Sequence, residues 1–155
     1  MRNALKPVWV VLLIFVAVGA ITAFPRLFAP KEVVPWRTDF SAARAESART
    51  HRPVFAYFTA SWCGYCQAMR GTTWADPKVA AALEAYVPVK IDVDDHRELS
   101  EQFDVRGLPS FAVLDDKGNP TKFGAGPKDS EQFIGWLKGN DRQAWNERRG
   151  AEAQR

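Results

Sequence analysis

Both cysteines of the chain lie in a single Cys-x-x-Cys motif, formed by Cys63 and Cys66. The motif follows a short apolar and aromatic run, residues 53–58, and precedes a stretch typical of a helix, so we expect it where a strand passes into a helix. A thiol at a helix N-terminus lies among unpaired backbone N–H groups, which lower its pKa below about 8.5. We therefore predict that Cys63 attacks substrate disulfides and that Cys66, almost one turn further along, resolves the mixed disulfide.

Three other uses of the pair stay open on the sequence alone. A structural zinc site needs about four ligands, and the extra candidates, His51 and His96, have no local ligand spacing. A purely structural disulfide usually ties distant segments, whereas this one would close a very small loop. A copper relay would add Met69, because soft sulfur ligands suit Cu(I). Thiol–disulfide exchange is favoured, and it requires no metal and no cofactor beyond the redox-active disulfide Cys63–Cys66.

Helices and strands must position this motif, and the sequence pattern predicts an α/β domain. Asp39 can cap a helix in which Phe40, Ala43 and Ala48 are candidates for the buried face. Asp76–Pro77 is a capping residue followed by a first-turn proline. The expected helices cover about 39–50, 78–85, 96–103 and 130–138, with a further helical turn after Cys66. The expected strands cover 53–58, 87–93, 110–114 and about 120–123. This order predicts a small central mixed sheet with helices on both faces.

An uncharged segment of 18 residues, Pro7–Phe24, precedes that domain. As a helix it would be about 27 Å long, close to the roughly 30 Å hydrocarbon core of a bilayer. Because Arg2 and Lys6 lie ahead of it, the positive-inside rule favours a cytoplasmic N-terminus. We expect a single-pass anchor in the inner (cytoplasmic) membrane, with the catalytic domain in the periplasm or otherwise outside the cytoplasm. The alternative is a signal peptide cleaved after Ala20 or Ala23, which would export the domain as well.

Composition and charge complete the predicted organisation. The parts are a cytoplasmic n-region (1–6), the transmembrane anchor or signal peptide (7–24), a proline-rich linker or short first strand (25–35), the folded domain (36–138) and a polar C-terminal tail (139–155). The net charge is +3. Without Arg2 and Lys6, the chain has 19 basic and 18 acidic residues, a net charge of +1. Since the basic residues do not cluster, we expect no nucleic-acid partner.

Four segments of the predicted domain carry a family resemblance: Arg52–Cys66, Asp76–Val79, Val89–Val93 and Val105–Ser110. Together they resemble the thioredoxin superfamily, and most closely the exported thioredoxin-like domains similar to the C-terminal domain of the bacterial transmembrane thiol:disulfide reductase. The resemblance covers about residues 36–138. It implies a thioredoxin fold, preceded in this chain by one N-terminal transmembrane helix.

The resemblance also implies a substrate-binding surface around the cysteines. Pro109 would be a cis-proline opposite them, Leu108 would present backbone groups to an extended substrate peptide, and Trp62 would flank and shield the site. A plain trans turn proline is the alternative for Pro109, because cis is only about 5% of X–Pro bonds in general. A solvent-facing tryptophan at the edge of the core is the alternative for Trp62.

Departures from the family pattern concern the pKa values of the cysteines. Thioredoxins hold a buried aspartate six residues before the first cysteine, where it helps to deprotonate the second; this chain has Tyr57 there. Related reductase domains carry an acid where this chain has Arg70. Lys90 lies near the place of the lysine that pairs with the buried aspartate. Without an acidic partner it would favour the Cys66 thiolate, and the alternative is an edge residue whose ammonium reaches solvent.

These observations predict a membrane-tethered, extracytoplasmic thiol:disulfide oxidoreductase that reduces or exchanges disulfides of exported proteins. The apolar segment contains no cysteine, so it could not carry electrons across the membrane. A separate membrane redox partner would have to reduce the Cys63–Cys66 pair again after each cycle. One alternative is a non-enzymatic module that holds a client or assembly partner in the thioredoxin groove. The other is an oxidase or isomerase that acts in the opposite direction.

We expect the protein to fractionate with membranes and to resist extraction at high salt. An apolar span is held by burial in the bilayer, whereas a surface-charge attachment is screened by salt. Carbonate and salt washes of isolated membranes, followed by immunoblotting, measure this. A soluble product that begins near Ile21 or Phe24 would show instead that the segment is a cleaved signal peptide.

Overall fold

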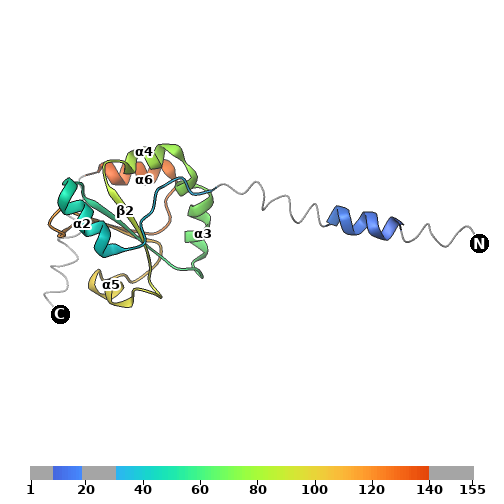
Figure 1. Ribbon diagram of the computed structural model, residues 1–155, viewed down its shortest axis with the longest axis horizontal. Helices are drawn as coiled ribbons and strands as arrows, with labels where there is room; N and C mark the ends of the chain where they lie inside the picture. The colour runs from blue at the N-terminus through green and yellow to red at the C-terminus, as the bar shows by residue number, and fades with distance from the viewer. Residues whose placement is uncertain (1–8, 19–30, 140–155) are drawn as a thin grey trace, which may run out of the picture. The chain divides into compact units, whose positions relative to one another are not determined.

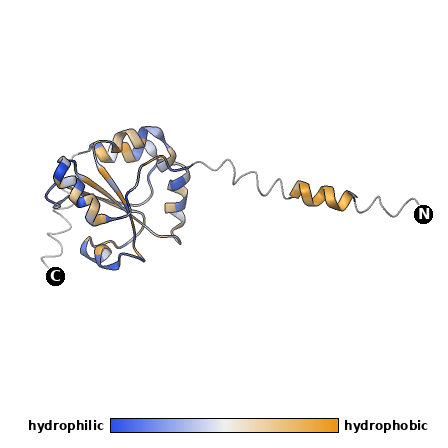
Figure 2. Cartoon of the chain, in the orientation of Figure 1, coloured by the Kyte–Doolittle hydropathy of each residue, from blue (hydrophilic) through white to orange (hydrophobic). Residues whose placement is uncertain are grey.

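The computed structural model describes residues 9–18 and 31–139, which belong to two compact units, residues 1–30 and 31–155 (Figure 1). In the first unit, residues 9–18 form a helix with exposed apolar side chains, such as Trp9 and Phe15 (Figure 2). Within the described ranges, no helix is both long and apolar enough to cross a membrane. The predicted segment 7–24 extends beyond this helix at both ends, into residues outside those described.

Helices and strands alternate in the second unit, nearly as the sequence predicts. In chain order they are α2 (Phe40–Thr50), β1 (Val54–Thr59), α3 (Gly64–Gly71), the 3-10 helix η1 (Thr73–Ala75), α4 (Pro77–Leu83), β2 (Val87–Asp92), α5 (Arg97–Gln102), β3 (Ser110–Leu114), β4 (Pro120–Ala125) and α6 (Ser130–Lys138). Asp39, Asp76 and Asp129 cap α2, α4 and α6, since each side chain accepts a hydrogen bond from a first-turn backbone N–H. The predicted caps at Asp39 and Asp76 are confirmed.

The sheet has four strands in the order β2-β1-β3-β4. β1 and β2 are parallel, whereas β3 is antiparallel to both β1 and β4. Parallel strands end at the same edge of a sheet. The segments that follow Thr59 and Asp92 therefore emerge side by side, and the first of them leads directly into the cysteine motif.

Two hydrophobic cores cover the two faces of the sheet, and β1 contributes to both. Phe55 and Tyr57 pack with residues of α3, η1, α4 and α6, whereas Val54, Ala56 and Phe58 pack with residues of α2 and α5. This alternation follows from the two-residue period of a strand. The predicted mixed sheet with helices on both faces is confirmed (Figure 1).

The segment ahead of α2 also packs on the domain. Val34 is buried, and the Val33 N–H donates a hydrogen bond to the Trp74 carbonyl at 2.8 Å. Further along, Arg37 forms an isolated parallel bridge with Val89 at the open edge of β2. Residues 31–35 therefore belong to the domain and not to the linker predicted over 25–35, because an apolar side chain and a backbone hydrogen bond tie them down. The rest of that linker lies outside the described residues.

The buried face of α2 differs from the prediction at one position. Ala43 is buried as expected and Phe40 is half-buried, but Ala48 is exposed and Ser47 is buried in its place. The Ser47 hydroxyl donates to the backbone carbonyl of Arg52. A polar side chain satisfied in this way can be buried at little cost.

Trp74 organises the core on the side of α3. It is fully buried, and its ring meets those of Trp36, Tyr57 and Phe133 at centroid distances of 5.2, 4.9 and 5.0 Å. We expect Trp74→Ala to lower the free energy of unfolding by about 3–5 kcal/mol, because it leaves a cavity among these rings. Urea unfolding followed by circular dichroism measures the loss. Trp62→Ala, the same substitution at a side chain that is 65% exposed, should cost within about 0.5 kcal/mol, and equal losses would contradict this assignment.

Candidate redox site

Cys63 and Cys66 form a disulfide at the start of α3. Cys63 is the N-cap residue, and its Sγ accepts a hydrogen bond from the Cys66 backbone N–H at 3.1 Å. The loop from β1 is closed by Gln67, whose side-chain amide donates to the Ser61 carbonyl at 2.6 Å. The predicted position between strand and helix is confirmed. A thiolate on Cys63 would lie at the positive end of the α3 dipole, next to a backbone donor already aimed at it.

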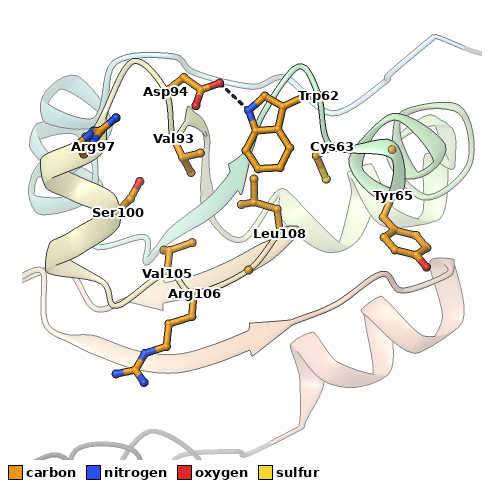
Figure 3. A pocket seen from close by; sticks show the side chains of 12 residues that line it. Trp62, Cys63, Tyr65, Val93, Asp94, Arg97, Ser100, Val105, Arg106 and Leu108 are labelled. Carbon is orange, nitrogen blue, oxygen red and sulfur yellow. Dashed lines mark hydrogen bonds between the residues drawn. The ribbon is translucent and has the colours of Figure 1, made fainter.

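The two cysteines have different surroundings. Both are packed in the core on the side of α3, with exposed fractions of 5% for Cys63 and 4% for Cys66. Cys63 also lines a hollow of about 620 Å³ (Figure 3). The apolar side chains around this hollow are Trp62, Tyr65, Val93, Val105 and Leu108, and its charged ones are Asp94, Arg97 and Arg106. Cys63 is therefore the sulfur that faces the hollow, as its predicted role requires.

Trp62 projects beside Cys63 and is held by a hydrogen bond. It is 65% exposed, and its Nε1–H donates to Asp94 Oδ2 at 2.8 Å (Figure 3). The contact exists because β1 and β2 are parallel, so that the loops after Thr59 and Asp92 meet at one edge. Asp94 was not among the predicted site residues. The signal for it is a group of three aspartates, Asp92, Asp94 and Asp95, at the carboxyl end of the strand beside the one that precedes the motif.

The loop before β3 supplies another part of the site. Leu108 lines the hollow, and Pro109 is buried. The peptide bond between them is cis, the conformation that the family resemblance implied. The Pro109 carbonyl accepts a hydrogen bond from the Gly126 N–H at 2.9 Å, which ties the loop to the residues after β4. Binding of substrate by Trp62, Leu108 and Pro109 stays a prediction.

Tyr57 is buried in an aromatic cluster beside the cysteines. Its ring lies 5.4 Å from Trp36, 4.9 Å from Trp74 and 5.7 Å from Phe111, measured between centroids. Its hydroxyl lies near Thr59 and Trp74 but not in hydrogen-bonding geometry, so it has no partner among the described residues. Burial raises the pKa of Tyr57 above its ordinary value, and the Glu32 carboxylate acts in the same direction. The side chain is therefore a neutral phenol near pH 7 and a poor base.

Lys90 is not the unpaired cation that the sequence analysis considered. Its ammonium donates a hydrogen bond to Glu32 Oε2 and lies 5.4 Å from the centroid of the Trp36 ring. Lys90 therefore has an acidic partner, Glu32. Its side chain is only 20% exposed, so its ammonium is not free in solvent either. Glu32 was not among the predicted site residues, because it lies in the segment interpreted as linker. The Val33-Val34 pair after it was the available signal that this segment is packed.

The histidines that a zinc site would need have other surroundings. His51 Nδ1 lies 2.8 Å from Asp116 Oδ2, on the turn between β3 and β4, and His96 precedes α5. Over the part of the chain that the structure describes, no three metal-binding side chains are grouped together. Met69 is buried in the same core as the cysteines.

Known proteins match the region that contains this site. The thioredoxin-like family matches residues 35–116, which include both cysteines and the Leu108–Pro109 loop. The chain belongs to this family. A protein disulfide-isomerase from Gallus gallus is 36% identical over 104 residues, which are 63% of this chain and 19% of that protein. The thiol:disulfide interchange protein DsbD of Ralstonia nicotianae is 39% identical over 82 residues, which are 50% of this chain and 13% of that protein.

Solved structures agree with this assignment. The C-terminal domain of Neisseria meningitidis DsbD in its reduced form has a TM-score of 0.57 and 27% identity, over 64% of this chain and 92% of that one. A thioredoxin from Thermus thermophilus has a TM-score of 0.61 and 29% identity, over 68% and 85%. The predicted thioredoxin fold and the similarity to the DsbD C-terminal domain are confirmed, and so is the disulfide oxidoreductase class at the level of the family. The chain spans about a fifth of the length of the isomerases that it matches.

We expect Tyr57→Asp to make the cysteine pair of this thioredoxin-like domain more reducing and to raise the apparent pKa of Cys66. A buried carboxylate beside the pair disfavours the thiolate and favours the protonated dithiol. The potential should fall by tens of millivolts, with about 30 mV equal to 1.4 kcal/mol for a two-electron couple. Equilibration with glutathione measures it, and Tyr57→Phe, which stays neutral, is the matched control.

The new carboxylate could also compete with Glu32 for Lys90, so Tyr57→Asp is repeated in a Lys90→Met background. An unchanged potential in both backgrounds would show that a charge at position 57 does not act on the cysteines.

Proposed function

We propose that this chain is a membrane-tethered, extracytoplasmic thiol:disulfide oxidoreductase that reduces or exchanges disulfides of exported proteins through Cys63 and Cys66. The observation that carries the proposal is the disulfide at the N-terminus of α3, with Cys63 on the wall of an apolar hollow. A disulfide with a purely structural role has no need of such a hollow beside one of its sulfurs. Membership of the thioredoxin-like family supports the same conclusion.

The reaction follows from the positions of the two sulfurs. In the reduced form, the Cys63 thiolate attacks one sulfur of a client disulfide, and the other client sulfur leaves as a thiolate that takes up a proton. Cys66, one turn along α3, then loses its proton and attacks Cys63 in the mixed disulfide. The bond between Cys63 and the client breaks, and the second client sulfur leaves as a thiolate that takes up a proton. The client gains two electrons and two protons, and the Cys63–Cys66 disulfide is restored.

The surface around Cys63 suits an extended polypeptide client. Trp62 and Tyr65 are each 65% exposed on either side of the cysteine, and Leu108 also lines the hollow (Figure 3). Exposed aromatic side chains offer a large apolar contact area at low cost in conformational entropy. Backbone groups of the Leu108–Pro109 loop would align a client strand beside the mixed disulfide.

The predicted anchor and the direction of electron flow complete the proposal. The apolar helix over residues 9–18 supports membrane attachment through the wider segment 7–24. A separate membrane redox partner would return electrons to the Cys63–Cys66 disulfide, and the resemblance to the bacterial transmembrane thiol:disulfide reductase favours the reducing direction. Isomerisation is the second candidate, because several of the matched relatives are protein disulfide-isomerases.

Trapping tests the proposal. In a Cys66→Ala variant, mixed disulfides with client proteins should accumulate on Cys63, because the resolving thiol is gone. Non-reducing gels of cells that express the variant measure them. The control is Cys63→Ser, which should trap nothing and should lose insulin reduction while the domain stays folded. Insulin reduction that persists in Cys63→Ser, or equal adducts in both variants, would overturn the proposed role of Cys63.

A further inference from the structure

Three charged side chains from separate segments meet beside α3. Glu32 comes from residues 31–36, Arg70 from α3 and Lys90 from β2. The Lys90 ammonium donates to Glu32 Oε2, and Arg70 Nε lies 3.8 Å from Glu32 Oε1. The side chains of Glu32 and Lys90 are each 20% exposed, and that of Arg70 is 64% exposed. The Glu32 carboxylate therefore forms ion pairs with both Arg70 and Lys90.

This charge cluster, Glu32, Arg70 and Lys90, is connected to Cys66 through α3 and through the core that contains Tyr57. Arg70 follows Cys66 by four residues in α3, which places both on one face of the helix, a turn apart. Lys90 is the direct partner of Tyr57 in the parallel pairing of β1 and β2. Tyr57 shares the buried core with Cys66, and the Trp36 ring packs against both Tyr57 and the Lys90 ammonium. Charges near such a core are weakly screened and act over longer distances than in water.

The sign of each charge decides its effect on the cysteines. Arg70 and Lys90 favour a thiolate, so on their own they stabilise the reduced pair and make it a better oxidant. The Glu32 carboxylate opposes them. Cys63 and Tyr57 share the buried core with Cys66, and the Tyr57 phenol is neutral near pH 7.

We propose that Glu32 sets the redox balance of the Cys63–Cys66 pair by offsetting the charges of Arg70 and Lys90 beside Cys66. Glu32 lies in the segment ahead of α2, outside the sheet. The position in β1 where thioredoxins have an aspartate is occupied by Tyr57. Glu32 is fixed in place by its own segment, since Val33 is hydrogen-bonded to Trp74 and Val34 is buried. Glu32 is thus a positioning residue of the redox site, an inference that rests on the proposed function of the pair.

The test is the equilibrium of the full-length protein with a glutathione redox series at pH 7. Glu32→Gln should shift the equilibrium constant about threefold to tenfold toward the reduced pair, where tenfold equals about 30 mV, and should lower the apparent pKa of Cys66. Lys90→Met should shift both in the opposite direction, and the double variant should return toward the parent protein. Glu131→Gln, an exposed acid of α6, is the matched control, and circular dichroism verifies that each variant is folded.

The outcomes separate this inference from the proposed function. If Glu32→Gln and Glu131→Gln give the same constant while the pair still equilibrates with glutathione, Glu32 does not tune the site and the proposed function stands. If Glu32→Gln shifts the equilibrium toward the disulfide, the assigned sign is wrong and the inference falls. If the parent protein does not exchange with glutathione at all, the proposed function and this inference fall together.

Discussion

The parallel pairing of β1 with β2 is the interaction on which the site depends. It brings the ends of both strands to one edge of the sheet, where Cys63 follows β1 and Asp94 follows β2. The same register sets Tyr57 opposite Lys90, on the face that α3 covers. A shift of one residue would turn every side chain of β1 to the other face of the sheet. The burial of β1 between two apolar cores therefore protects the geometry of the site as well as the stability of the fold.

The core on the side of α3, which includes both cysteines, is rich in aromatic rings. Trp36, Phe55, Tyr57, Trp74, Phe111 and Phe133 contact one another in it. The described residues offer no hydrogen-bond partner to the Tyr57 hydroxyl or to the indole nitrogens of Trp36 and Trp74. Such a core excludes bulk water from beside Cys66. Charges at its edge therefore influence the thiols more strongly than they would on an open surface.

The sequence predicted most of the fold and the centre of the site, for local reasons. Strand and helix periods, aspartate caps and the Cys-x-x-Cys spacing are all features of neighbouring residues, and the structure places each element within a few residues of its prediction. The misses involve residues that are distant in sequence. Glu32 reaches Lys90 and Arg70, and Asp94 reaches Trp62, through tertiary contacts that no local pattern encodes. The buried Ser47 is a local exception, because its hydroxyl donates to the carbonyl of Arg52, five residues further on, where the chain has left α2.

The packing of residues 31–36 against the domain concerns two separate properties of the cysteine pair. One is which sulfur reacts, and the other is how strongly the pair oxidises or reduces. In the proposed mechanism, Cys63 is the attacking sulfur because it lies at the N-terminus of α3, whereas the charge near Cys66 depends in part on Glu32, an acid far ahead of the motif. Chains with an identical motif can therefore differ in redox character through their leading segments alone. The oxidising or reducing strength of such a protein can then change, in evolution or by design, without any alteration of the helix that carries out the chemistry.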